Sequence, residues 1–266
     1  MLEAIFRRVE DLWAWAFGRP ALRKFNLALF RLGAHGLGLL NNRSLVLSGE
    51  AWLIRHVLHD REAPIVFDVG AHEGRWSERV LRCNPRSRIF AFEPHRLSYA
   101  RLVECVPGVR TFNVAVGERR EQLPLHDYAD RPGSSHASLV DGVIERLNKA
   151  EAMIQHVEVL PLDEIAGDAG VKKIDLLKID VEGMELAVLR GARRLLAEDA
   201  VKCIQFEFNE MNVLSRSLFA DFHALLAPRF RLYRLLPHGW LPLDDYIPWL
   251  HEQFVYQNIV AVLKDS

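Results

Sequence analysis

The apolar positions of the first 60 residues recur with the period of an α-helix. One face of the first predicted helix is formed by Leu2, Ile5, Phe6, Val9, Leu12, Trp13 and Ala16. Charged residues occupy much of the remaining surface. Pro20 is placed to begin a second helix, and Ser48 is placed to cap a third helix that starts at Gly49. Residues 1–60 are therefore predicted to form a helical extension.

From Pro64 the pattern changes, and short apolar runs alternate with helical segments. Strands are predicted at Ile65–Val69, Arg88–Glu93, Val109–Val114, Lys173–Asp180, Val201–Phe208, Phe230–Leu235 and Phe254–Val262. Helices are predicted at Gly74–Cys83, Leu97–Val103, Met184–Leu196 and Ser217–Leu226. Residues 115–160 interrupt the alternation with two further strands around a polar loop. The pattern is typical of an α/β fold with a mostly parallel, doubly wound sheet, in a domain that spans residues 61–266.

A glycine turn joins the first predicted strand to a helix in the stretch IVFDVGAHEG, residues 65–74. In such sheets the ligand lies beyond the carboxyl ends of the strands. Gly70 and Gly74 do not complete the G-x-G-x-x-G pattern of dinucleotide-binding proteins. Asp68 and Glu73 would repel a pyrophosphate and favour a cationic ligand such as S-adenosylmethionine. Glu73 alone is equally explained by the favourable position of an acid at the start of a helix.

A second acid, Glu93, ends the next predicted strand, 25 residues after Asp68. A carboxylate at this strand end can accept hydrogen bonds from both hydroxyls of a ribose. The alternative is an acid that is merely solvated at the end of its strand. Together with the glycine turn, Glu93 favours a cationic ligand that contains a nucleoside.

A family resemblance rests on six motifs: FDVGAHEGRWS, FAFEPH, FNVAVGE, VEVLPLDEI, IDLLKIDVEGMELAVLRGA and IQFEFNE. From about Leu45 to Leu263 the chain resembles the FkbM-family methyltransferases, which are Rossmann-like. The resemblance implies an S-adenosylmethionine-dependent enzyme that methylates a hydroxyl of a sugar, glycan or other natural product. It implies a cofactor site formed by Asp68, Gly70, Ala71, Gly74, Glu93, Asn113, Ala115, Val116 and Asp180. His72 departs from the family pattern, which usually has Asn at this position.

Methyl transfer to a hydroxyl group benefits from a general base. The alternation of side chains along a strand places Lys178 and Asp180 on one side of their strand, and Glu207 and Asn209 on one side of the next. A buried charge needs a partner, so Lys178 is expected to pair with Glu207 or Asp180. These residues predict a cluster of polar side chains at the strand ends, in which Asp180, Glu182 or Glu207 acts as the base. The alternative is a purely structural ion pair.

Other residues could also take part in the chemistry. Asp180, Glu207 and Asn209 carry the oxygen ligands that Mg²⁺ prefers, but Lys178 would oppose a cation, and we expect no metal. Further candidates for a base near neutral pH are His72, His126, His136 and His156.

The composition limits the kinds of partner that the protein is expected to bind. The 34 Lys and Arg residues balance 35 Asp and Glu residues, which gives no indication of nucleic-acid binding. The three cysteines form no disulfide or metal pattern, and a cytoplasmic protein is expected. The N-terminal helices are expected to pack on the core or on a second subunit of a homodimer, with peripheral membrane contact as the alternative. An NAD-dependent oxidoreductase and a non-catalytic scaffold that binds S-adenosylmethionine are the competing functions.

Overall fold

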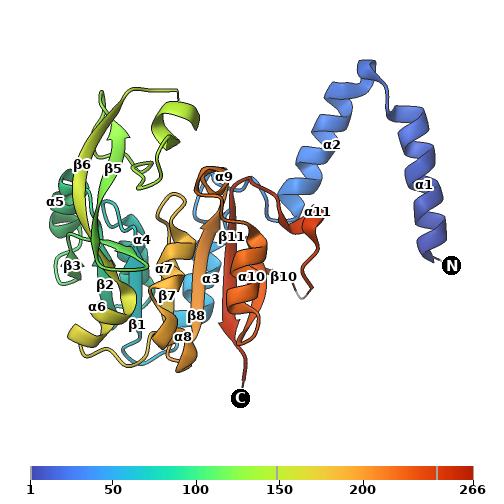
Figure 1. Ribbon diagram of the computed structural model, residues 1–266. Coiled ribbons are helices and arrows are strands. Elements are labelled where there is room, and N and C mark those ends of the chain that lie inside the picture. Colours follow the sequence, from blue (N-terminus) through green and yellow to red (C-terminus); the bar gives the residue numbers. More distant parts are fainter. Residues whose placement is uncertain (1, 148, 244, 266) are drawn as a thin grey trace.

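The computed structural model describes residues 2–147, 149–243 and 245–265. An eight-stranded sheet with helices on both faces forms its centre, and a three-stranded sheet lies at one side (Figure 1). Two N-terminal helices project from the opposite side (Figure 1). Residues 1 and 266, the outer bounds of the two predicted units, lie outside the described residues. The division of the chain near residue 60 stays a prediction.

Five parallel strands form the half of the central sheet that follows the glycine turn. They are β1 (Ile65–Val69), β2 (Arg88–Phe92), β3 (Arg110–Phe112), β7 (Leu176–Ile179) and β8 (Cys203–Phe208). The chain runs outward from β1 through β2 to β3, and then returns to β7 on the other side of β1. This reversal of strand order is the place where open α/β sheets bind their ligands.

The other half of the central sheet is antiparallel. Strand β11 (Gln257–Leu263) lies between β8 and β9 (Phe230–Leu236), and β10 (Gly239–Pro242) forms a hairpin with β9 at the edge. Four of the seven strand pairings are parallel, which confirms the predicted mostly parallel sheet. The predicted strands 173–180 and 254–262 both begin about three residues too early.

Helices cover both faces of the central sheet, as expected for a doubly wound fold. One face carries α3 (Glu50–Leu58), α4 (Arg75–Cys83) and α5 (Arg96–Cys105). The other face carries α6 (Leu162–Asp168), α7 (Glu185–Arg190), α8 (Arg193–Ala197) and α10 (Phe219–Leu226). Helix α3 packs on the sheet through Leu53 and Ile54, although it precedes residue 60.

The predicted helix 184–196 is divided into α7 and α8 by a close approach of two backbones. A Cβ atom on Gly191 would lie 1.9 Å from the carbonyl oxygen of Gly117. Gly117 ends β4 (Ala115–Gly117), so the second sheet passes directly against this break. The apolar periodicity of the segment does not reveal this contact, because Gly117 is distant in the sequence.

The predicted cap of α3 is wrong by one residue. Gly49 occupies the cap position with a φ of 85°, and the Ser48 hydroxyl instead donates a hydrogen bond to Glu50 (2.8 Å). A Cβ atom on Gly49 would lie 2.3 Å from the carbonyl oxygen of Leu236. The entry into α3 therefore requires a glycine for both its conformation and its packing.

The second sheet consists of β4, β5 (Glu121–Tyr128) and β6 (Ala152–Pro161). The predicted strand 109–114 ends at Phe112, because the chain leaves the central sheet and β4 pairs with β6 instead. Between β5 and β6 lie the polar loop 129–142 and a short π-helix, Val143–Leu147. The two remaining short helices are α9 (Met211–Ser215) and α11 (Pro248–His251).

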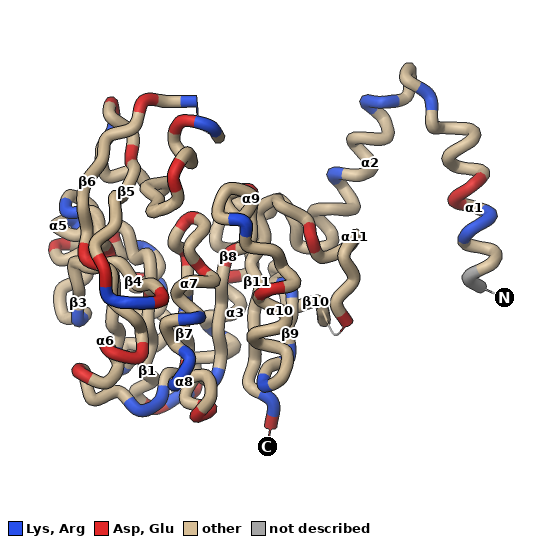
Figure 2. Tube along the Cα trace, viewed as in Figure 1, with Lys and Arg blue, Asp and Glu red and all other residues tan. Residues whose placement is uncertain are grey.

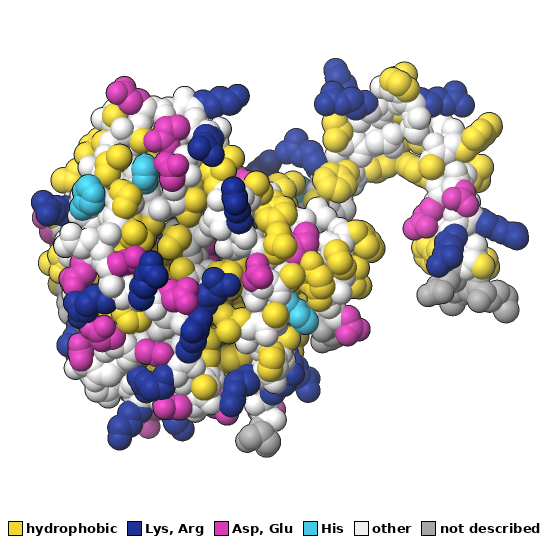
Figure 3. All heavy atoms as spheres, in the orientation of Figure 1, with side chains coloured by type: hydrophobic (Ala, Val, Ile, Leu, Met, Phe, Trp, Pro, Cys, Tyr) yellow, Lys and Arg dark blue, Asp and Glu magenta, His cyan; other side chains and the backbone are white. Residues whose placement is uncertain are grey.

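The helices α1 (Leu2–Phe17) and α2 (Arg23–Gly36) form an arm, residues 2–36, that stands away from the sheet (Figures 1 and 3). A 3-10 turn, Pro20–Leu22, joins them. Among the arm side chains that the structure describes, only Ala34 is buried. Of the two predicted packing arrangements, packing of α1 and α2 on the core is therefore wrong, and packing on a second subunit stays a prediction. None of the described helices is long and apolar enough to cross a membrane.

Candidate active site

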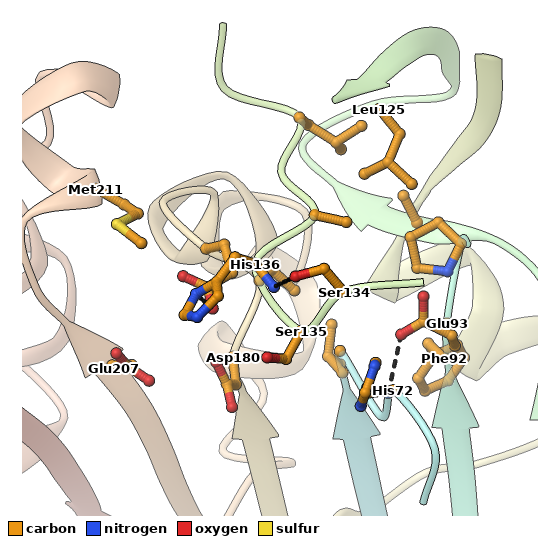
Figure 4. Close-up of a pocket in the computed structure, with 18 of the residues that line it drawn as sticks. His72, Phe92, Glu93, Leu125, Ser134, Ser135, His136, Asp180, Glu207 and Met211 are labelled. Atoms are coloured by element: carbon orange, nitrogen blue, oxygen red, sulfur yellow. Dashed lines mark hydrogen bonds and ion pairs between the residues drawn. The ribbon is translucent and has the colours of Figure 1, made fainter. Parts of the chain in front are cut away.

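A cavity of about 460 Å³ lies at the carboxyl ends of β1, β2, β7 and β8 (Figure 4). The predicted site residues that line it are Gly70, Glu93, Ala115, Val116, Asp180, Glu182 and Glu207. The predicted residues that lie outside its lining are Asp68, Ala71, Gly74, Asn113 and Lys178. The roles of all twelve residues in the site stay predictions, and these five lie outside the cavity lining.

The glycine turn after β1 passes tightly against the end of β7. Gly70 has a φ of 79°, and a Cβ atom on it would lie 1.7 Å from the carbonyl oxygen of Asp180. The backbone N–H groups of Gly70 and Ala71 both donate to the carbonyl oxygen of Phe92. Gly74 has a φ of 84° and packs against α5 at the start of α4. Ala71 and Gly74 therefore shape the turn without contacting the cavity.

Glu93 lies directly after β2, at the end of the cavity shown beside His72 in Figure 4. Its two carboxylate oxygens accept hydrogen bonds from the backbone N–H groups of His72 (2.9 Å) and His95 (2.8 Å). Asn113 donates to the carbonyl oxygens of Glu93 and Pro94, and so holds this segment from outside the cavity. Burial raises the pKa of Glu93 to about 7, although the two backbone hydrogen bonds lower it. Each oxygen retains a lone pair for a further donor, as the binding of two ribose hydroxyls requires.

Lys178 lies beneath the cavity between two acids. Its Nζ is 3.2 Å from Oδ1 of Asp68 and 3.3 Å from Oδ2 of Asp180. It also donates to the carbonyl oxygen of Gly70 (3.2 Å), while Ser77 donates to the other oxygen of Asp68 (2.7 Å). Asp68 is fully buried, and Lys178 is only 4% exposed. The ion pair therefore fastens β1 to β7 below the glycine turn.

These contacts decide between the expectations for Lys178. Burial lowers its pKa, but Asp68, Asp180 and Glu50 raise it by more, so the pKa lies above its ordinary value and the side chain is charged. The predicted pairing with Asp180 is confirmed, whereas the ion pairs described for Lys178 do not include Glu207. These contacts support the interpretation of Lys178 as part of a structural ion pair, and its predicted place among the catalytic residues stays a prediction. Asp68 is likewise its partner and not part of the cavity wall.

Asp180 and Glu207 lie at the end of the cavity away from Glu93 (Figure 4). Burial raises the pKa of Glu207 well above its usual range, and the neighbouring Asp180 and Glu182 raise it further. The Asn209 side chain donates to Oε1 of Glu207 at 2.5 Å and opposes this shift. The predicted cluster of polar groups is thus present at the carboxyl ends of β7 and β8.

The loop 129–142 is tied to both ends of the cavity. At one end His136 Nδ1 lies 3.5 Å from Oε1 of Glu182, and this contact raises the pKa of His136. The Ser138 hydroxyl donates to the carbonyl oxygen of Glu182 (2.7 Å). At the other end the His72 ring bonds to the carbonyl oxygen of Gly133 (2.9 Å). His72 and His136 line the cavity, whereas the other two candidate histidines, His126 and His156, do not.

Sequence reasoning missed Glu185, which shapes the segment after β7. Glu185 is 1% exposed, and its Oε1 accepts hydrogen bonds from the backbone N–H groups of Val181 (3.2 Å) and Gly183 (3.0 Å). Burial raises its pKa to about 7. The sequence signal that could have identified Glu185 is an acid in the first turn of a predicted helix. Tyr256 and Asn42 also line the cavity, and no local pattern marks them.

The ionisable side chains that line the cavity are mainly acids. Five carboxylates line it: Glu93, Asp180, Glu182, Glu207 and Glu210. Over the described ranges, no Lys or Arg side chain lines it. Within the same ranges, no three His, Cys, Asp or Glu residues form a group that could hold a metal ion. Such a lining disfavours a pyrophosphate and suits a cationic ligand.

The chain is similar in sequence to known methyltransferases. Residues 68–235 match the methyltransferase FkbM domain. The chain is 26% identical over 193 residues to the 2-O-methyltransferase NoeI of Sinorhizobium fredii, covering 68% of this chain and 78% of NoeI. It is 26% identical over 155 residues to the hexuronic acid methyltransferase AglP of Haloferax volcanii, covering 56% of this chain and 59% of AglP. A solved structure of the plantazolicin methyltransferase BpumL with S-adenosylhomocysteine aligns over 98% of this chain, with a TM-score of 0.43 and 10% identity.

Open α/β sheets bind their ligands at the switch point of strand order, and the acids around this cavity suit a cationic ligand. The chain belongs to the FkbM family of methyltransferases, because the domain match spans more than half of its length. It is a methyltransferase whose cofactor is S-adenosylmethionine, as predicted. The lining fits this cofactor, since Glu93 faces the cavity and four further acids line it, namely Asp180, Glu182, Glu207 and Glu210.

Proposed function

We propose that the protein methylates a hydroxyl group of a sugar, glycan or other natural product. One observation carries this proposal: a cluster of carboxylates lies at the end of the cavity away from Glu93. A ribose bound at Glu93 would direct the reacting end of the cofactor toward this cluster. The names of NoeI, a 2-O-methyltransferase, and AglP, a hexuronic acid methyltransferase, support a hydroxyl acceptor on a sugar.

The residues that would hold the cofactor are Gly70, Glu93, Ala115, Val116 and Asp180. When bound, S-adenosylmethionine supplies an activated methyl carbon. The protein then has to align the acceptor hydroxyl, exclude water and accept a proton. The loop 129–142, which is fastened at Gly133 and at Ser138, is placed to exclude water from the cavity.

Glu207 is the best candidate for the base among the predicted acids. Asp180 is paired with Lys178 at 3.3 Å, and Glu182 is in contact with His136. Burial raises the pKa of Glu182 as well, but both acids are already engaged with a basic side chain. Glu207 has a neutral hydrogen-bond partner, Asn209, and its raised pKa makes its carboxylate more basic.

Glu93→Ala is expected to raise the dissociation constant of S-adenosylhomocysteine by about tenfold or more. The physical reason is that hydrogen bonds to a charged group contribute ~1.5–3 kcal/mol. In the wild-type protein the dissociation constant should also rise as the pH falls through about 7, because Glu93 then takes up a proton. Calorimetric titration at a series of pH values measures both effects. Glu93→Gln, which cannot titrate, should lose the pH dependence, and unchanged affinity in Glu93→Ala would remove Glu93 from the cofactor site.

We expect the acceptor to be a neutral or amino sugar, because Asp180, Glu182 and Glu207 would repel a carboxylate close to the reacting hydroxyl. The test incubates the protein with isotopically labelled S-adenosylmethionine and a panel of neutral, amino and hexuronic acid glycans. Mass spectrometry then detects the added methyl group. Labelling of hexuronic acids alone would contradict this expectation.

Thermal unfolding with S-adenosylhomocysteine and with NAD is the matching control for ligand class. Stabilisation by NAD alone would support the competing oxidoreductase. Stabilisation by S-adenosylhomocysteine, with no methylated product from any glycan or natural-product extract, would support the non-catalytic scaffold.

A further inference from the structure

The arm, residues 2–36, exposes an unusual amount of apolar surface. Its exposed large apolar side chains are Ile5, Phe6, Val9, Leu12, Trp13, Trp15, Phe25, Leu27, Leu29, Phe30 and Leu32. Trp15, Leu32 and Phe6 are 76%, 69% and 66% exposed. Contacts within the arm cover only the region where its helices meet, where Trp13 stacks on Phe17 at 4.3 Å between ring centroids. Exposed apolar surface of this extent marks an interaction site.

The charge of the arm differs from that of the rest of the protein. Residues 1–36 contain six Lys and Arg but three Asp and Glu, whereas the remaining residues contain 28 and 32. The helical spacing places Lys24 and Arg31 on one side of α2, and Phe25, Leu29 and Leu32 on a separate side about a third of a turn away. Lys and Arg residues gather where α1 and α2 meet (Figure 2). The arm is thus both amphipathic and basic.

We propose that the arm binds to the surface of a membrane that contains anionic lipids. Its apolar side chains would enter the boundary between headgroups and acyl chains, and its Lys and Arg side chains would contact the lipid phosphates. Tryptophan is favoured at this boundary, and Trp13 and Trp15 supply it. The arm lies on the membrane and does not span it, because neither of its described helices is long and apolar enough.

The charge pattern favours a lipid surface over a second copy of the chain. Two arms that packed together would bring two net-positive segments into contact. An anionic lipid surface is complementary to the same charge and can bury the side of α2 that carries Phe25, Leu29 and Leu32. Burial of the apolar side chains and attraction of the basic residues to anionic lipids therefore both favour binding to the membrane.

The test measures sedimentation of the full chain with vesicles of phosphatidylcholine, with and without phosphatidylglycerol. We expect about tenfold or stronger partition onto the anionic vesicles, and a decrease as salt is added. Phe6→Glu combined with Leu32→Glu should abolish binding. Arg23→Gln combined with Arg31→Gln should weaken the partition by roughly fivefold for each charge removed.

Matched controls are available on the body of the protein. Val103→Glu changes an exposed apolar residue on α5, and Arg86→Gln changes an exposed arginine far from the arm. Neither should alter vesicle binding, and all variants should bind S-adenosylhomocysteine as the wild type does. Equal binding of wild type and Phe6→Glu/Leu32→Glu would overturn the proposal. A lipid-independent dimer that this double variant dissociates, seen by sedimentation equilibrium in the absence of vesicle binding, would overturn it in favour of a second copy.

Discussion

Glutamine in place of Glu207 is expected to slow methyl transfer by about 10²–10⁴-fold, the usual contribution of a general base. The amide has nearly the same shape as the carboxylate, and its oxygen can still accept the hydrogen bond from Asn209. The variant should therefore fold normally and bind S-adenosylhomocysteine with nearly unchanged affinity. Single-turnover methyl transfer measures the chemical step, and denaturant unfolding measures the stability of the same variant.

The pH dependence provides a second measurement of the same role. Burial together with Asp180 and Glu182 raises the pKa of Glu207, and only its deprotonated form can accept a proton. The wild-type rate should thus increase with pH through a pKa that lies above the usual range of a glutamate. Glu207→Gln should lose this rise, and Glu207→Asp should keep it at a reduced rate. Glu104→Gln, on the exposed surface of α5, serves as the matched control.

A Glu207→Gln variant with full activity would show that Glu207 is not the base. Alignment of the acceptor hydroxyl alone can supply a large part of the rate acceleration in such a displacement. In that case Asp180→Asn and Glu182→Gln would be the next variants to compare. A base shared between these acids would appear as a partial loss in each variant and a larger loss when they are combined.

The alternation of apolar runs and helical segments was sufficient to predict the doubly wound sheet. Strands that are buried on both faces consist almost entirely of apolar residues, and every residue of β7 is buried. The prediction failed where a distant segment decides the local structure. The strand predicted to continue through Val114 ends at Phe112, because Ala115 pairs with Val159 in the second sheet.

Some residues of the candidate site could be identified from the sequence, and others could not. Acids at strand ends identified Glu93, Asp180 and Glu207, since the carboxyl ends of parallel strands meet at one edge of a sheet. The partner Asp68 of Lys178 was missed, although the two residues are direct neighbours in the register of β1 and β7. Register depends on how the whole sheet assembles, and the spacing of residues within one strand does not reveal it.

Lys178→Met is expected to destabilise the protein by ~3–5 kcal/mol, the usual result of removing one partner from a buried ion pair. The change leaves Asp68 as a fully buried carboxylate, and it removes a hydrogen bond to the carbonyl oxygen of Gly70. The glycine turn should loosen as a result, and the affinity for S-adenosylhomocysteine should decrease. Denaturant unfolding and calorimetric titration of the same sample measure the two effects.

A double-mutant cycle separates the ion pair from the packing of the lysine stem. Asp68→Asn combined with Lys178→Met removes both charges, so the double variant should be more stable than the sum of the two single losses predicts. Lys172→Met, on an exposed residue of the same segment, should change the free energy of unfolding by about 0.5 kcal/mol or less. Additive losses in the cycle would show that Asp68 and Lys178 are not coupled. The support of the glycine turn would then have to come from Ser77 and the backbone hydrogen bonds to Phe92.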